Sequence, residues 1–147
     1  MHNLPILGTN QVSEMFAIPV RRLTAFAELQ IVDHHDQRPG TGNTRRYSIA
    51  NLMMTKLASN LQQLGVAPKK LSTKAEHLNY GIAEYLDEPK TAPRYMFIWL
   101  TSNMEVKVSW HTSTTFTYPT SILMDLKMLH EEINDKLATE SGLYYAG

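Results

Sequence analysis

"QVSEMFAIPVRRLTAFAELQIV", residues 11 to 32, predicts two short helices joined by a tight corner. With Thr9 as the N-cap of the first helix, Val12, Met15 and Phe16 recur at helical spacing. Pro19 ends that helix, because the residue before a proline is pushed away from helical angles, and it suits the first turn of a second helix. The apolar face of the second helix consists of Val20, Leu23, Phe26, Ala27 and Leu29. Outside that face lie Arg21, Arg22 and Thr24.

The residues after this corner predict a small hairpin followed by a long helix. Ile31 and Val32 can begin an extended segment, "RPGTG" (38–42) is turn material, and Tyr47 returns as a strand residue. We expect Ser48 to cap a helix that ends at Gly65, a residue suited to the left-handed position after a helix. The apolar face of this helix is Ile49, Leu52, Met53, Leu57, Leu61 and Leu64.

The second half of the chain changes from a helical to an extended pattern. Pro68 opens one further helix that we expect to reach Leu86, and "DEPKTAP" (87–93) reads as a linker. Strands are expected at 95–100 and 105–110, and Pro119 is expected to end the sheet. A last helix, capped by Thr120 or Ser121, has apolar positions at Ile122, Leu126, Leu129, Ile133 and Leu137.

This order of elements predicts an α+β fold with two domains. Residues 1–86 form the helical domain, and residues 87–147 form a small domain with a strand pair or three-stranded antiparallel sheet and a C-terminal helix. The second domain would serve dimerisation, or the binding of an effector or partner.

Three motifs, in order, resemble the DNA-binding domain of the MerR family, a winged helix-turn-helix. The stretch 11–32 is similar to the two-helix reader, and "GNTRRYSIANL" (42–52) is similar to the wing and the helix after it. "LQQLGVAPKKL" (61–71) is similar to the family's second corner. The resemblance runs from residue 8 to residue 72. It implies a winged helix-turn-helix that binds double-stranded DNA as a homodimer.

The residues expected at the DNA lie at the start of the second helix and in the wing. A recognition helix reads base edges in the major groove with side chains near its N-terminus, where arginine can bond guanine. Arg45 and Arg46 would offer charge to phosphates, and Tyr47 would either contact a phosphate or pack under the wing. The expected DNA-binding residues are Pro19, Val20, Arg21, Arg22, Thr24, Asn43, Thr44, Arg45, Arg46 and Tyr47.

The chain departs from the family pattern at three positions of the two-helix reader. Ala17 stands where the family usually has glycine in the first corner. Thr24 and Ala25 replace an arginine and a tyrosine that contact the DNA backbone in the family. The C-terminal half does not resemble the family's long dimerisation helix.

The net charge is zero, but the positive and negative residues are unevenly distributed along the chain. Residues 1–80 carry nine Lys or Arg against five Asp or Glu, whereas residues 81–147 carry five against nine. A surplus of four positive charges in one part is a hint that this part meets a polyanion.

Several other kinds of site are excluded or unsupported by the residue types present. The absence of cysteine excludes disulfides, thiolate metal sites and cysteine nucleophiles. The adjacent pair His34 and His35 suits an exposed loop better than a metal site, and no catalytic constellation or cofactor motif accompanies it. The apolar runs are too short to span a bilayer and no secretory signal is apparent, so we expect a cytoplasmic protein without membrane contact.

These observations favour a non-enzymatic, sequence-specific DNA-binding protein, a transcriptional regulator that acts as a homodimer. Two alternatives stay open. One is an architectural DNA-binding protein of a phage or mobile element, for excision or packaging. The other is a protein-interaction adaptor on a winged-helix scaffold, which Thr24 and Ala25 motivate. A third, weaker option treats the aromatic residues of the expected sheet as a small-molecule sensor that alters DNA affinity, and the sequence does not identify its effector.

Overall fold

The computed structural model describes residues 4–34, 45–115 and 120–140, and within them the chain is a mixed α+β structure. Its first part contains β1 (Leu7–Gly8), α1 (Thr9–Phe16), α2 (Val20–Glu28), β2 (Arg46–Tyr47) and α3 (Ile49–Gln63). Its second part contains α4 (Pro68–Ser72), α5 (Ala75–Asp87), β3 (Tyr95–Leu100), β4 (Val106–His111), β5 (Ile122–Asp125) and α6 (Leu126–Glu140).

The two short helices and their tight corner are confirmed, with small shifts at their ends. Gly8, not Thr9, is the N-cap of α1, and Pro19 is the N-cap of α2 rather than part of its first turn. Ala17 adopts the left-handed conformation, with φ 55° and ψ 42°. The Ser13 hydroxyl donates to the carbonyl of Ile18 at 2.6 Å, which ties the corner to α1.

The expected pairing of the hairpin is wrong, because the strand at Tyr47 pairs with the segment before α1. Leu7 lies opposite Tyr47 and Gly8 opposite Arg46 in the antiparallel β1–β2 ribbon. Ile31 and Val32 form no strand, since both backbone N–H groups donate to the carbonyl of Phe26 and close the end of α2. The turn that we expected at 38–42 lies outside the described residues.

Helix α3 follows the sequence prediction closely and forms the centre of the molecule. Ser48 and Asn51 form the reciprocal cap expected at a helix start: the Ser48 Oγ accepts from the Asn51 N–H, and the Asn51 Oδ1 from the Ser48 N–H. At the other end Gly65 has φ 99° and Val66 donates to the carbonyl of Leu61. Leu64, which we placed on the apolar face, is instead 63% exposed.

The single helix expected from Pro68 to Leu86 is two helices, α4 and α5. The hydroxyls of Ser72 and Thr73 donate to the carbonyls three residues earlier, those of Lys69 and Lys70. The last turn of α4 is also tightened, because the backbone N–H groups of Thr73 and Lys74 donate to the carbonyls of Lys70 and Leu71, three residues earlier. These local bonds end α4, and a new helix begins at Ala75.

The C-terminal sheet has three antiparallel strands in the order β4-β3-β5. The two strands expected from the sequence are confirmed as β3 and β4. Ile122 was expected in the last helix, but it pairs with Ile98 as the first residue of β5. Pro119 therefore does not end the sheet, and α6 begins only after Asp125.

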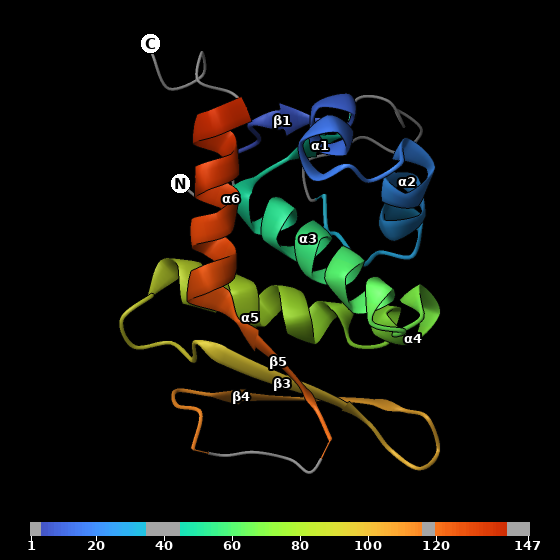
Figure 1. Ribbon diagram of the computed structural model, residues 1–147, viewed down its shortest axis with the longest axis vertical. Helices are drawn as coiled ribbons and strands as arrows, with labels where there is room; N and C mark the ends of the chain where they lie inside the picture. The colour runs from blue at the N-terminus through green and yellow to red at the C-terminus, as the bar shows by residue number, and fades with distance from the viewer. Residues whose placement is uncertain (1–3, 35–44, 116–119, 141–147) are drawn as a thin grey trace.

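The elements are stacked in layers with α6 along one side (Figure 1). The sheet lies under α5, α5 lies under α3, and α1 and α2 lie at the opposite end from the sheet. One continuous hydrophobic core runs from Leu7 and Val12 through α3 to Met96 and Leu137, so the two expected domains share a core.

Candidate nucleic-acid interface

The start of α2 presents three of the expected site residues to solvent. Pro19, Val20 and Arg21 are exposed, Val20 to 39%. Leu23 and Phe26 are almost fully buried and hold the opposite side of α2 against the core. The spacing of these two residues therefore fixes which face of α2 is available. Arg22 and Thr24 are half-buried at the margin of that face.

The remaining expected residues that the structure describes lie in or next to β2, and they differ in their exposure to solvent. Successive side chains of a strand point to opposite sides, so Arg46 is exposed whereas Tyr47 is 1% exposed. Burial also raises the pKa of Tyr47. Tyr47 is thus a core residue under the ribbon, and its hydroxyl is not available to a phosphate. Arg45 is half-buried. Asn43 and Thr44 lie outside the described residues.

Helix α1 connects the two groups of arginines. Arg46 lies opposite Gly8, the residue that caps the start of α1, and three residues separate the end of α1 from the start of α2. Eight residues of helix measure about 12 Å, which is also about the width of the major groove. In Figure 1, α1, α2 and β1 gather at one end of the molecule.

Three arginines at this end have no acidic partner within the described residues. Among the described residues, no ion pair engages Arg21, Arg22 or Arg46. The exposed positive charges are therefore not neutralised within that part of the chain, and an anion could approach them.

The ribbon is fastened to its surroundings by two residues that sequence reasoning did not place at the interface. The His34 Nδ1 lies 3.0 Å from the carbonyl oxygen of Arg46, and its ring meets the Tyr47 ring edge-on at 4.7 Å. The Asn51 Nδ2 donates to the carbonyl of Asp33 at 2.8 Å. We considered His34 only beside His35, because nothing in the sequence indicates a contact between residues 34 and 46.

Metal binding and membrane crossing find no support among the described residues. They contain no group of three His, Cys, Asp or Glu side chains able to hold a metal ion. In that same part of the chain, no helix has both the length and the apolar character needed to cross a bilayer.

Comparison with known proteins gives no independent assignment. No protein-family model matches this chain, and no curated protein matches it.

Proposed function

We propose that this chain is a non-enzymatic, sequence-specific double-stranded DNA-binding protein built on a winged helix-turn-helix. In this reading α1 and α2 are the helix-turn-helix, α2 is the recognition helix, and the β1–β2 ribbon is the base of the wing. The observation that carries the proposal is the pair Arg21 and Arg46. Both are exposed, both lack an ion pair in the described part of the chain, and both belong to elements packed against α1.

The chemistry of the two arginines assigns them different roles. Arg21 lies in the first turn of α2, where a side chain entering the major groove can bond guanine O6 and N7. Val20 beside it has enough exposed apolar surface to contact a thymine methyl group. Arg46 lies on a strand outside the helix pair, so it would contact a phosphate and fix the register.

The proposal includes a homodimer acting as a transcriptional regulator in the cytoplasm. One recognition helix reads only a short half-site, and a two-fold dimer reads two half-sites about one helical turn apart. The acidic α6 is not a candidate for the DNA contact, because its exposed Glu131, Glu132 and Asp135 would repel phosphates.

A selection of bound duplexes from a random DNA pool, followed by anisotropy titrations, tests this function. We expect a palindromic motif and an affinity that falls with salt by about 0.9 log units per decade for each phosphate contacted. Arg46→Ala should weaken all duplexes alike and reduce the salt slope by about one contact, whereas Arg21→Ala should also relax sequence preference.

Lys127→Ala is the matched control, because it removes an exposed positive charge from α6, which is not part of the proposed DNA interface. Its binding should equal that of the wild type. Absence of salt-dependent duplex binding by the wild-type chain would refute the proposal. A stable protein partner in its place would favour the adaptor, and bending of the duplex without an effect on promoters would favour the architectural protein.

A further inference from the structure

The imidazole of His34 bridges the segment after α2 to the backbone of β2. Its Nδ1 lies 3.0 Å from the Arg46 carbonyl oxygen, twelve residues further along the chain. A carbonyl oxygen can only accept a hydrogen bond, so Nδ1 must carry a proton and donate. The bond fixes the tautomer of the ring and holds the backbone from which the Arg46 side chain projects.

The surroundings of His34 keep the ring neutral. Its Nε2 is buried and has no hydrogen-bond partner among the described residues. Burial lowers the pKa of His34, and the Arg45 charge acts in the same direction, while the Arg46 carbonyl and the Asp33 carboxylate oppose them. A neutral ring with its proton on Nδ1 is therefore the form that the site favours.

The His34 ring also contacts the core. The Tyr47 ring packs edge-on against it, and Tyr47 is anchored in the core. Asp33, the residue before His34, is held through its carbonyl by Asn51, which belongs to the cap of α3. His34 thus acts as a rigid link between α3, the core and the strand that carries Arg46.

We propose that His34 is a positioning residue for DNA binding: its Nδ1–H holds the backbone of β2 so that Arg46 reaches the phosphate. This inference rests on the proposed function. It predicts that the hydrogen-bond donor, and not the imidazole as such, is what binding requires.

Two substitutions of similar size separate the donor from simple packing. Asparagine can place an N–H donor near the position of Nδ1, whereas leucine fills the space without a donor. In duplex titrations with the selected motif, we expect His34→Asn to bind within about twofold of the wild type. His34→Leu should bind about fivefold more weakly, at an unfolding temperature close to that of His34→Asn.

A double-substitution cycle with Arg46→Ala shows whether His34 acts through that arginine. In the Arg46→Ala background, His34→Leu should cost nothing further, because the group that it positions is already gone. A general loss of structure would weaken that variant again, since Arg21 would still be affected. Nitrogen NMR of the free protein at pH 7 should show the proton of His34 on Nδ1.

The failures of the two proposals are distinguishable. Wild-type binding that Arg46→Ala weakens but His34→Leu does not would overturn the role of His34 and leave the function intact. A proton on Nε2 would overturn it without any DNA present. A wild-type chain that binds no duplex would overturn both.

Discussion

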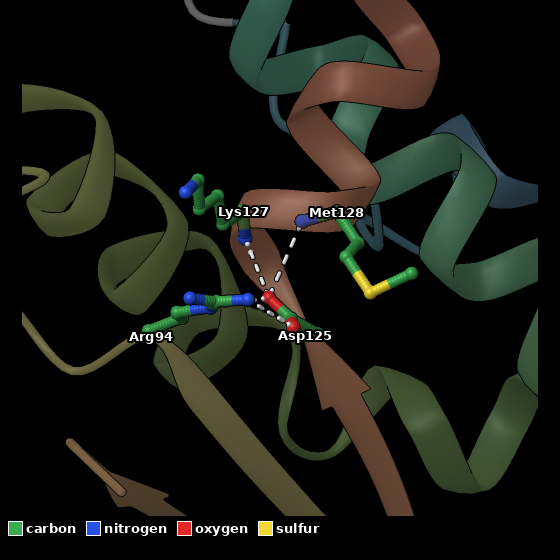
Figure 2. A network of polar contacts seen from close by, with 4 residues as sticks. All are labelled: Arg94, Asp125, Lys127 and Met128. Carbon is green, nitrogen blue, oxygen red and sulfur yellow. Dashed lines mark hydrogen bonds and ion pairs between the residues drawn. The ribbon is translucent and has the colours of Figure 1, made fainter.

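The two ends of the molecule differ in whether their solvent-accessible arginines are paired with a carboxylate. At the sheet end (residues 94–111 and 122–128), the Arg94 guanidinium forms two hydrogen bonds of 2.8 and 2.7 Å with the Asp125 carboxylate (Figure 2). At the α1–α2 end (residues 7–28 and 45–48), Arg21 and Arg46 have no ion pair within the described residues. Charges satisfied internally add to stability, and charges left unpaired are available to a partner.

Left-handed backbone at residues other than glycine occurs in both parts of the molecule: at Ala17 and Gln30 beside α2, and at Met104 in the turn between β3 and β4. The first helix corner holds Ala17 in the left-handed region, at φ 55°, which is costly for a residue with a Cβ. The second corner meets the same need with Gly65, at φ 99°. The two helix corners therefore differ in strain, but only the unpaired arginines distinguish the α1–α2 end from the sheet end.

The largest effect is expected where the sheet meets α5. A Cβ at Gly81 would overlap the indole ring of Trp110, whose Nε1 donates to His77 on the same helix. Helix propensity alone would favour alanine there by about 1 kcal/mol, but overpacking costs about 1–3 kcal/mol or more. We expect Gly81→Ala to lower the free energy of unfolding by up to about 2 kcal/mol in urea titrations, because the indole ring must move to make room for the added Cβ.

The matched control is the same change in a Trp110→Ala background. Without the ring, Gly81→Ala should be neutral or stabilising by up to about 1 kcal/mol. An equal loss in both backgrounds would show that the indole is not the cause.

A smaller effect is expected at Asp125, which holds both the sheet and the start of α6. Its carboxylate accepts from Arg94 and from the backbone N–H groups of Lys127 and Met128 (Figure 2). Asp125→Ala removes the cap and the ion pair together, and loss of a cap alone costs about 0.5–2 kcal/mol. Asp125→Asn should keep the cap and lose less stability.

The pH dependence of the Asp125→Asn variant has a definite sign. The hydrogen bonds from Arg94 lower the pKa of Asp125, although burial opposes them. The stabilisation is therefore complete above the ordinary aspartate pKa of about 3.9, and it is lost as the pH falls from that value through the lower pKa of the folded state. Unfolding measured at pH 7 and at low pH should show the difference from the wild type shrinking on acidification. A constant difference would contradict this reading.

The smallest effects are expected at the two helix corners, and they should have opposite signs. Ala17→Gly relieves the left-handed strain and should stabilise by about 0.5–1 kcal/mol. Gly65→Ala should destabilise by about 1 kcal/mol through the backbone alone, because no atom lies within 4 Å of the added Cβ. Thermal unfolding of both variants would measure the pair. Changes of the same sign would remove the contrast in strain between the corners.

Sequence reasoning succeeded where a structure depends on residues a few positions apart. The Ser48 cap, the glycine after α3 and the strands β3 and β4 were all predicted. The prediction of a single helix from Pro68 to Leu86 was wrong, because two local patterns compete there. The hydrophobic periodicity continues past Thr73, but the Thr73 hydroxyl bonds to the backbone and helps to end the helix. Ile122 suits a helix face and a strand equally well, and only its pairing with Ile98 decides the matter.

For the candidate site, the sequence supplied the arginines but not their arrangement. Arg21 and Arg46 were expected at the interface, and both are exposed. Tyr47 was left between two roles, and its burial makes it a core residue. His34 was not expected at the interface, because its bond to Arg46 spans twelve residues and depends on which strand β2 pairs with. Binding to DNA itself stays a prediction.

The sequence by itself determined the α+β class, the two helix corners and the surplus of positive charge in the first part of the chain. Hydrophobic periodicity, caps and turn residues act within about one helical turn, so neighbouring residues are sufficient to specify them. The tertiary structure alone decided that β2 pairs with β1, that Trp110 lies on Gly81 and that Arg94 meets Asp125. Each of these contacts joins residues about 30 or more positions apart, so patterns within one helical turn do not specify it.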